Sequence, residues 1–307
     1  MLNNVLKTIR KYDMNLSGTV VCGFSGGADS LCLVHILKKL GIPLLCVHVN
    51  HNLRGGESIR DENFCLSFCE KEDIPLKIIS LSLNGKSEEA ARNARYEALQ
   101  NVAAGKAIAL AHNADDNAET VLFNLIRGCA LNGLCGIKPV RENIIRPLIE
   151  CTKNDILKYA QANNLCFVTD STNFSNDYTR NFIRNEILPK IKEINPKFVE
   201  NTSVLTNLLT KDNNFLETLS NNCVEPIIDL DYALKSRIIQ KKYKQAAGTH
   251  YNLSSKYVNE IIKILPKQKC KIDLPCKVTA FVENSELSFE KKAKDYLHKR
   301  KAANTND

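Results

Sequence analysis

Long apolar runs are missing from this chain of 307 residues. It contains no stretch of about 18 consecutive apolar residues, the length that a membrane-spanning helix needs, and no charged segment followed by an apolar leader. We therefore expect a soluble, cytoplasmic protein with no membrane span, no export signal and no membrane partner. No internal repeat is visible in the sequence.

Closely spaced cysteine pairs are missing as well. The chain has twelve cysteines, but no two of them have CxxC spacing, so a structural zinc or iron–sulfur site has no support from the sequence. Cys22 and Cys46 fall in apolar segments, and we expect them to be buried and reduced. The nearest spacings are found in three pairs: Cys65 and Cys69, Cys129 and Cys135, and Cys270 and Cys276.

Positive charge is unevenly distributed along the chain. The net charge is +8, yet residues 1–150 hold 17 Lys and Arg against 16 Asp and Glu, whereas the remainder holds 25 against 18. A basic second half beside a nearly neutral first half indicates contact with a polyanion. A solvated, lysine-rich surface without a partner is the alternative interpretation.

Strand and helix patterns alternate through the first half of the chain. Apolar strand patterns at 20–23, 43–49, 76–81 and 107–111 are followed by helical patterns at 31–40, 57–71, 88–103 and 116–127. This alternation predicts an α/β fold with an open, mainly parallel sheet and helices on both faces.

The second half predicts a smaller, mostly helical domain. We place the domain boundary near residue 200, which gives domains of 1–200 and 201–307. Helical patterns are found at 155–163, 181–194, 201–219 and 258–265. Residues 277–289 alternate like a β-hairpin, and residues 291–301 form a basic helix or tail.

A glycine-rich turn follows the first predicted strand, with the sequence Val20-Val21-Cys22-Gly23-Phe24-Ser25-Gly26-Gly27-Ala28-Asp29-Ser30. The order of strand, turn and helix places backbone N–H groups and a helix N-terminus around a point where an anion can bind. Ser25 and Ser30 can donate hydrogen bonds to a phosphate, whereas Asp29 is suited to holding Mg²⁺ or orienting a neighbour. The alternative is a tight turn with Ser30 as N-cap.

Polar clusters at 25–30, 48–54 and 112–119 each fall just past the end of a predicted strand. Ligands of parallel sheets bind beyond the carboxyl ends of the strands, so we expect the three clusters to form one site. The sequence Asn84-Gly85-Lys86-Ser87 ends like a Walker A loop, but Ser80 stands where the leading glycine would be required, which argues against such a loop.

The turn at 25–30 resembles the SGGxDS loop of the ATP-pyrophosphatase (PP-loop) superfamily. Further blocks in the same order, covering about residues 18–190, resemble the short form of the tRNA(Ile)-lysidine synthase family. Asn50, Asn113 and Asn117 depart from the family pattern, which has Asp, His and Gln there. The matching blocks are His48–Arg54, Glu89–Tyr96, Ala111–Thr120, Gly133–Ile137, Arg146–Leu148 and Asp170–Pro189.

This resemblance implies an ATP-dependent carbon–nitrogen ligase. Such an enzyme joins free lysine to C2 of the wobble cytidine, position 34, in a tRNA(Ile) with a CAU anticodon. ATP first adenylates the cytidine with release of pyrophosphate, and lysine then displaces AMP. ATP and Mg²⁺ are the implied cofactors, residues 1–200 the catalytic domain and residues 201–307 a tRNA-contacting domain, with a homodimer as a possible assembly.

The resemblance also implies roles for individual residues. ATP contacts are assigned to Ser25, Gly26, Gly27, Ala28, Asp29, Ser30, His48, His51 and Arg54. Catalytic roles fall to Asp29, His112, Asp115, Asp116 and Glu119, with Asp29 and Asp116 as metal ligands. Arg92 and Arg95 are assigned to phosphate or the lysine carboxylate, and tRNA contacts to Arg180, Arg184, Lys241, Lys242 and Lys244.

Each of these roles has a structural alternative. Acidic side chains favour helix N-termini in any case, and spacing predicts that Asp115 and Glu119 share a helix face while Asp116 points elsewhere. The histidines could be structural hydrogen-bonding or core residues. The arginines have acidic neighbours along the chain: Glu88 and Glu89 for Arg92 and Arg95, and Glu186 for Arg180 and Arg184.

Two other functions remain open from the sequence. A PP-loop tRNA thiolation enzyme normally needs CxxC pairs, which this chain lacks. A tRNA-binding relative without catalysis would have no need for the Ser25–Ser30 loop or for the carboxylates at positions 115, 116 and 119.

Overall fold

The computed structural model describes residues 1–50, 56–81, 88–168, 179–248 and 252–291. The chain divides into two compact units, Met1–Thr210 and Lys211–Asp307. The division falls inside helix α10 (Phe198–Asn222), about ten residues beyond the boundary expected from the sequence. No glycine or proline interrupts α10, so the helix continues without a break from one unit into the next.

The first unit is built around a sheet of six strands in the order β3-β2-β1-β4-β6-β5. All neighbouring strands are parallel except β5 and β6, which pair antiparallel. The strands are β1 (Val20–Gly23), β2 (Leu44–Asn50), β3 (Leu76–Ser80), β4 (Ile108–Ala109), β5 (Val140–Arg141) and β6 (Ile144–Ile145). The expected open, mainly parallel sheet is therefore confirmed.

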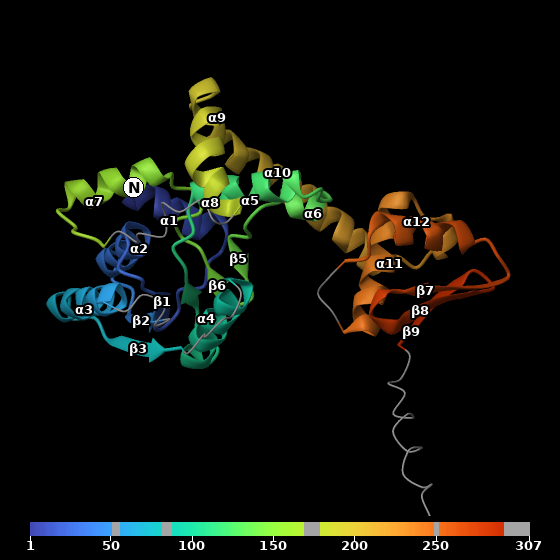
Figure 1. Ribbon diagram of the computed structural model, residues 1–307, viewed down its shortest axis with the longest axis horizontal. Coiled ribbons are helices and arrows are strands. Elements are labelled where there is room, and N and C mark those ends of the chain that lie inside the picture. The colour runs from blue at the N-terminus through green and yellow to red at the C-terminus, as the bar shows by residue number, and fades with distance from the viewer. Residues whose placement is uncertain (51–55, 82–87, 169–178, 249–251, 292–307) are drawn as a thin grey trace, which may run out of the picture. The chain divides into compact units, whose positions relative to one another are not determined.

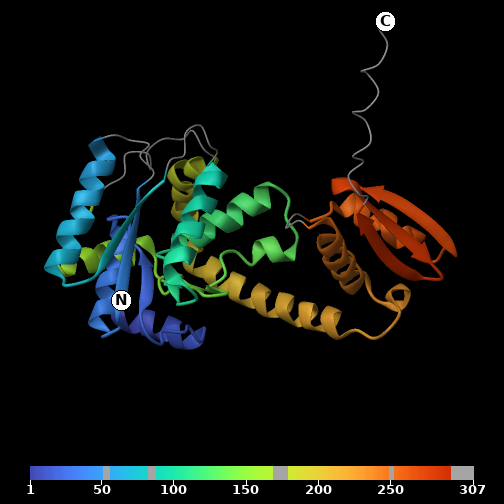
Figure 2. The ribbon, with the colours of Figure 1, turned by 90° about the horizontal axis from the view of Figure 1, so that it is seen from below.

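Helices cover both faces of this sheet (Figures 1 and 2). Successive residues of a strand point to opposite faces, so Val20 and Cys22 of β1 join one core and Val21 the other. The larger core is completed by α1 (Leu2–Lys11), α2 (Ala28–Lys39), α3 (Gly56–Lys71) and α7 (Lys153–Ala162), and the smaller one by α4 (Glu88–Ala103).

Helix α5 (Ala114–Ile126) begins at a capping box. The Asn113 side chain accepts a hydrogen bond from the Asp116 N–H, and Asp116 accepts one in return from the Asn113 N–H, each at 3.0 Å. Asparagine is among the best N-cap residues. The departure from the family pattern at position 113 thus gives a residue that is well suited to starting this helix.

The order of the strands determines where a site can form. Strand β1 has β2 on one side and β4 on the other, so the chain reverses its direction of winding between these neighbours. Ligands of such sheets bind at this switch point, outside the carboxyl ends of the strands. The Ser25–Ser30 turn follows β1 and the 112–119 segment follows β4, which brings two of the predicted polar clusters together.

The second unit packs two helices on a small antiparallel sheet of order β7-β8-β9. Asn284 and Ser285, between β8 and β9, both have positive φ angles, as a tight two-residue hairpin turn requires. The hairpin expected at 277–289 is therefore confirmed. The elements are α11 (Tyr232–Ala247), α12 (Ser255–Ile264), β7 (Lys269–Leu274), β8 (Val278–Glu283) and β9 (Glu286–Lys291).

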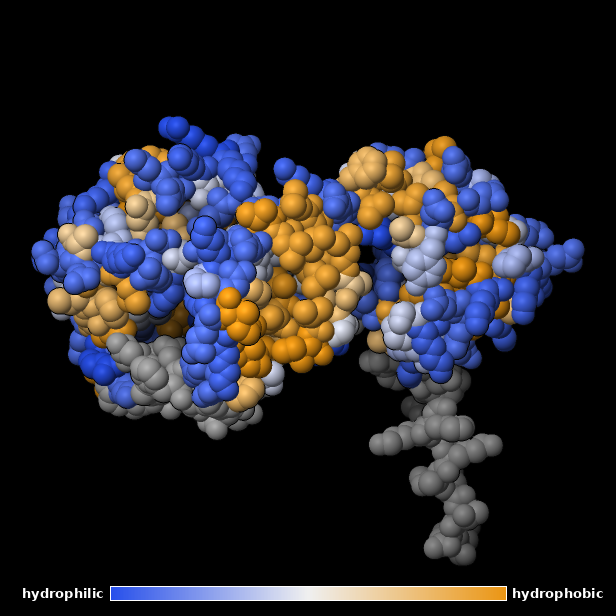
Figure 3. Space-filling view, turned by 90° about the horizontal axis from the view of Figure 1, so that it is seen from above, coloured by the Kyte–Doolittle hydropathy of each residue, from blue (hydrophilic) through white to orange (hydrophobic). Residues whose placement is uncertain are grey.

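Large apolar side chains are exposed in the first unit near the C-terminal end of α5. Apolar residues also gather into a broad area in the space-filling view (Figure 3). The exposed side chains on α5 and the first part of α10 are Leu125, Ile126, Val204, Leu205 and Leu208.

In the described part of the chain, no helix combines the length and apolar character needed to cross a membrane.

Gly136 permits a close contact that fixes the segment after α6 (Leu131–Leu134). Its φ angle is +67°, and a Cβ atom there would lie 2.1 Å from Asn117 Oδ1, which accepts a hydrogen bond from the Ile137 N–H at 2.7 Å. We expect Gly136→Ala to lower the free energy of unfolding by roughly 2–4 kcal/mol, because it adds backbone strain and breaks this buried hydrogen bond.

The matched control is Gly41→Ala, since Gly41 has φ +72° with no atom within 4 Å of the added Cβ. Its loss should be about 1 kcal/mol, from the backbone alone. Urea unfolding of both variants measures the difference, and equal losses would contradict the role given to the Asn117 contact.

Candidate active site

The turn after β1 is folded by hydrogen bonds among its own residues. Ser30 Oγ accepts from the Ser25 N–H at 3.2 Å, lies 3.1 Å from Ser25 Oγ and donates to the Gly27 carbonyl. Gly27, not Ser30, is the N-cap of α2. Gly26 has φ +79°, and a Cβ there would lie 2.9 Å from Val168 Cγ2, so the backbone approaches its neighbours as only glycine allows.

Asp29 lies in the first turn of α2, after the buried Ala28, and is paired with a lysine from a distant helix. Lys153 Nζ donates to both Asp29 carboxylate oxygens, at 2.8 and 2.7 Å, and Asn113 Nδ2 donates to one of them at 3.2 Å. The side chains of Asp29 and Lys153 keep 32% and 42% of their exposure. The pair is therefore open to solvent and to a ligand.

Asp115 is more deeply buried and is held by two donors. Lys192 Nζ donates to Oδ1 at 2.5 Å, and the Lys153 N–H donates to Oδ2 at 2.7 Å. Lys153 thus contacts Asp29 through its side chain and Asp115 through its backbone. It links the two strand-end segments of the site.

Asp116 and Glu119 share one arginine. Arg184 Nε and Nη2 donate to the two Glu119 oxygens at 2.7 and 2.8 Å, and Nη2 also donates to Asp116 at 3.1 Å. The expectation that Asp116 points away from Glu119 is therefore wrong, because both carboxylates bind Arg184. A π-helical turn at Ile183–Ile187 carries this arginine, and such turns are frequent at functional sites.

The surroundings of Arg184 and Asp116 change the pKa values of both groups. Burial, the neighbouring Glu119 carboxylate and Asp29 together raise the pKa of Asp116 to about 6. Burial alone would lower the pKa of Arg184, but its paired bonds to Glu119 outweigh burial and raise it. Asp116 thus changes its charge near neutral pH, while Arg184 stays charged.

His112 lies among cations. Arg146 Nε donates to His112 Nδ1 at 3.2 Å. Burial lowers the pKa of His112 to about 3, with further contributions from Arg146, Arg92, Arg95 and Arg180. The ring is therefore neutral at physiological pH.

The remaining arginines predicted for the site lie on two helices. Arg92 and Arg95 are exposed on α4, and the Arg92 guanidinium lies 5.7 Å from the Tyr96 ring centroid. Arg180, on α8 (Thr179–Phe182), donates to Thr120 Oγ1 at 3.0 Å and lies over the Phe123 ring. The Glu88 and Glu89 side chains, the alternative partners, are outside the described residues.

His48 occupies a core position beneath the turn. It is 6% exposed, its Nδ1 lies 3.0 Å from the Phe24 carbonyl oxygen, and Cys65 Sγ lies 3.4 Å from the same nitrogen. This arrangement matches the core-histidine alternative, and a direct contact of the ring with ATP stays a prediction. His51 and Arg54 lie outside the described residues.

The described residues offer too few ligands to hold a metal ion without ligands from water or from a bound substrate. Among the residues that the structure describes, no group of three or more His, Cys, Asp or Glu side chains is arranged to hold a metal. Mg²⁺ commonly takes only one or two protein carboxylates, completing its shell with water and substrate phosphates. Asp116, and Asp29, whose negative charge raises the pKa of Asp116, fit that requirement.

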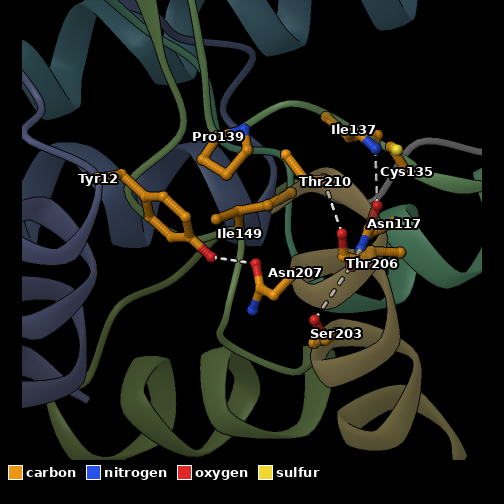
Figure 4. Close-up of a pocket in the computed structure, with 10 residues that line it drawn as sticks. All are labelled: Tyr12, Asn117, Cys135, Ile137, Pro139, Ile149, Ser203, Thr206, Asn207 and Thr210. Atoms are coloured by element: carbon orange, nitrogen blue, oxygen red, sulfur yellow. Dashed lines mark hydrogen bonds between the residues drawn. The ribbon is translucent and has the colours of Figure 1, made fainter. Parts of the chain in front are cut away.

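A narrow crevice lies beside the site, between α10 and the start of the chain (Figure 4). Tyr12 OH donates to Asn207 Oδ1 at 2.5 Å, and Asn117 Nδ2 donates to Thr206 Oγ1 at 3.2 Å. These bonds hold α10 against the rest of the first unit. The crevice is lined by Tyr12, Asn117, Cys135, Ile137, Pro139, Ile149, Ser203, Thr206, Asn207 and Thr210.

The lysines predicted to contact tRNA differ in their surroundings. Lys241 Nζ donates to Asn221 Oδ1 at 2.8 Å, and Lys242 Nζ donates to the Leu287 carbonyl at 2.9 Å, which joins α11 to β9. The Lys244 ammonium has no such partner in the described part of the chain. These contacts give Lys242 a structural role and leave Lys244 available to a ligand.

Three cations of the site have no role assigned from the sequence, although one of them, Arg146, lies in the block Arg146–Leu148 that matches the family. Lys153, Lys192 and Arg146 carry cations into it from α7, α9 (Leu188–Ile194) and the end of β6. Lys153 directly follows Thr152, the N-cap of α7, which is a signal for the helix start but not for the ion pair.

The chain is similar to known proteins of one domain family. Residues 2–191 match the family model of the PP-loop domain. The chain is 35% identical to the tRNA(Ile)-lysidine synthase of Caldanaerobacter subterraneus, over 95% of this chain and 69% of that protein. It is 32% identical to the tRNA(Ile)-lysidine synthase of Clostridium tetani, over 97% of this chain and 73% of that protein. It is 37% identical to that of Clostridium acetobutylicum, over 85% of this chain and 64% of that protein.

Among solved structures, the U34-tRNA thiolase NcsA of Methanococcus maripaludis has a TM-score of 0.57 at 23% identity, covering 68% of this chain and 77% of its own. This likeness concerns the fold. The chain spans about two thirds of the length of the curated relatives.

Asp116 is expected to destabilise the folded chain at neutral pH. Because its folded-state pKa of about 6 lies above the ordinary value of 3.8, the stability it contributes is present below pH 4 and lost as pH rises through 6. Asp116→Asn should therefore raise the free energy of unfolding by roughly 1–3 kcal/mol at pH 8, with the gain fading towards pH 4.

Asp155→Asn is the matched control, because Asp155 holds the same third position in the capping box of α7. Denaturant unfolding between pH 4 and 8 gives both values. A gain for Asp116→Asn that does not depend on pH, or an equal gain for Asp155→Asn, would refute this account of the charge.

Proposed function

The chain belongs to the tRNA(Ile)-lysidine synthase family of PP-loop proteins, and from this we propose that it ligates free lysine to the wobble cytidine of tRNA(Ile). The bond forms at C2 of the cytidine at position 34 in a CAU anticodon. ATP activates the cytidine through an adenylated intermediate, and pyrophosphate and AMP are released. The observation that carries the proposal is the meeting of the Ser25–Ser30 turn with four paired carboxylates at the sheet switch point.

The proposed reaction needs groups that bind phosphate and groups that bind an ammonium, and residues suited to each lie at the site. The carbonyl oxygen at C2 attacks the α-phosphorus of ATP, an O–P bond forms, and pyrophosphate leaves with the electrons of the broken bond. Backbone N–H groups of the turn, the α2 N-terminus and the arginines around His112 suit these phosphates. Mg²⁺ held by Asp29 and Asp116 would neutralise phosphate charge.

The carboxylates suit the lysine that attacks in the second step. Each of the four is already paired with a cation of the chain: Asp29 with Lys153, Asp115 with Lys192, and Asp116 and Glu119 with Arg184. A substrate ammonium would replace one of these cations at its carboxylate charge for charge, whereas Mg²⁺ would bring one more positive charge. Asp29 and Asp115, whose partners are single lysine amines, are the groups at which such an exchange is easiest.

Lysine attacks as the free amine, although its pKa in solution is about 10.4, so a group must accept its proton. His112 is unsuited to this task for two reasons. Its pKa of about 3 makes it a weak base, and its Nδ1 already accepts a hydrogen bond from Arg146. Asp116, with its raised pKa, is the better acceptor among the described groups.

The second unit is proposed to contact the tRNA backbone through its lysines. A homodimer and a cytoplasmic location stay predictions. Thiolation is disfavoured by the missing CxxC pairs, because that chemistry normally draws on such pairs for metal or sulfur. An inactive tRNA-binding role is disfavoured by the pairing of the carboxylates around the turn.

The proposal predicts that the chain, with ATP, labelled lysine and a tRNA(Ile) transcript, attaches lysine to the RNA. Asp29→Asn should reduce lysine-dependent pyrophosphate release at least 100-fold, because the amide keeps the shape but loses the charge that holds a cation. Its affinity for the transcript should stay within tenfold of the wild type. Release is followed by a pyrophosphate assay and affinity by filter binding.

Asp61→Asn is the control, since Asp61 is an acidic residue of α3 that forms an ion pair with the adjacent Arg60 side chain. Folded protein that transfers no lysine would overturn the proposed function. A loss of transcript affinity above tenfold in Asp29→Asn would make Asp29 a structural residue.

The lysines of α11 yield a separate prediction. Lys244→Ala should weaken transcript binding a few-fold and reduce the slope of log affinity against log salt by about 1, with little change in melting temperature. Lys242→Ala should instead lower the melting temperature, because it loses the bond to Leu287. Filter binding at several salt concentrations decides, and an unchanged slope for Lys244→Ala would remove that residue from the tRNA surface.

A further inference from the structure

We propose that Arg146 is a positioning residue: it fixes His112 as a neutral imidazole that offers its Nε2–H to an anionic oxygen of the substrate. This inference rests on the proposed function for the identity of that oxygen, a phosphate oxygen of ATP or of the departing pyrophosphate. The state of the imidazole itself follows from the contacts of the folded chain and can be measured without substrate.

The hydrogen bond between the two residues determines the tautomer. Arg146 Nε lies 3.2 Å from His112 Nδ1. An arginine nitrogen can only donate, so Nδ1 must be the acceptor and carry no proton. A neutral imidazole then has its proton on Nε2. His112 is left with one donor and no further acceptor.

Arg146 is itself held in place. It is 5% exposed, and its Nη1 donates to the Lys138 carbonyl oxygen at 2.7 Å. Burial lowers the pKa of Arg146, whereas the Tyr96 hydroxyl, which hydrogen-bonds to it, raises that pKa. The guanidinium is thus anchored on a backbone carbonyl and a phenol while its Nε points at His112.

The charges around His112 favour a neutral ring. Facing it are Arg92 and Arg95 from α4 and Arg180 from α8, in addition to Arg146. Within the described residues Arg146 forms no ion pair with a carboxylate. A buried, uncompensated guanidinium is costly, and an anionic ligand would relieve that cost. The arginines around His112 therefore favour an anionic ligand, and they oppose a second proton on the ring.

The consequence concerns the step in which pyrophosphate leaves. Negative charge grows on the departing phosphate oxygens, and a fixed N–H donor stabilises it. Because His112 enters the step neutral, it donates a hydrogen bond without giving up its proton. The pH dependence of adenylation then carries no ionisation of His112 in the physiological range.

The test is ¹⁵N NMR of the histidine rings in the wild-type protein without ligand, with His112→Asn used to assign the signals. We expect His112 Nδ1 to show the shift of an unprotonated ring nitrogen, Nε2 that of an N–H, and neither to titrate between pH 5 and 8. A proton on Nδ1, or titration in that range, would overturn the inference with no variant needed.

Arg146→Met tests the cause. Removing the donor should let His112 titrate nearer to pH 6.5, add an acidic limb to the pH profile of kcat/KM for pyrophosphate release, and lower that kcat/KM about 10- to 100-fold. Arg146→Lys, which keeps the charge, should restore part of the activity. Arg141→Met, a change at an exposed arginine on β5, should leave both the ring signals and the pH profile unchanged.

If Arg146→Met does not fold, the ring signals of the wild-type protein decide the inference alone. If Arg146→Met folds and His112 stays neutral with its proton on Nε2, Arg146 does not position the ring. Wild-type protein with the expected ring signals but no lysine transfer would refute the proposed function and leave the pairing intact.

Discussion

The site depends on the pairing of buried or half-buried carboxylates with cations from the same chain. Asp29, Asp115, Asp116 and Glu119 converge at the ends of neighbouring parallel strands, where their mutual repulsion would oppose folding. Lys153, Lys192 and Arg184 offset this repulsion. Taking one partner away from a buried pair costs more than the pair contributes, so the cations and carboxylates must be arranged together. Ligand binding at such a site is an exchange of one cation for another.

The second constraint is the separation of charge within the site. Acidic groups gather around Arg184, whereas arginines gather around His112. Both groups are set by the start of α5, since His112 precedes the N-cap Asn113 and the carboxylates follow it. One capping box thus orients a side rich in arginines and a side rich in carboxylates. The proposed reaction, which brings together a triphosphate and an ammonium, would use both.

The parts of this structure that were predictable from the sequence are those with local signals. The strands β1 to β4, the helices between them and the hairpin turn at Asn284 and Ser285 follow from periodicity and turn chemistry. Strands β5 and β6, of two residues each, carry no periodicity. Helix α11 was missed because its lysines were interpreted as a charged surface.

The ion pair of Asp29 with Lys153 joins residues 124 positions apart, and no local pattern encodes such a contact. The sequence also misplaced Asp116, which was expected to point away from Glu119, since the helix start alone does not say which carboxylates share an arginine.

The contact between Asn117 and Gly136 has a consequence for how this sequence can change over time. The Asn117 amide fills the space that a side chain at position 136 would need, and its hydrogen bond to Ile137 depends on that vacancy. Neither position can vary freely while the other stays as it is. A larger residue at 136 becomes acceptable only after position 117 has become smaller and the Ile137 N–H has found another acceptor. The two positions are therefore epistatic, and the departure from the family motif at 117 fits this local packing.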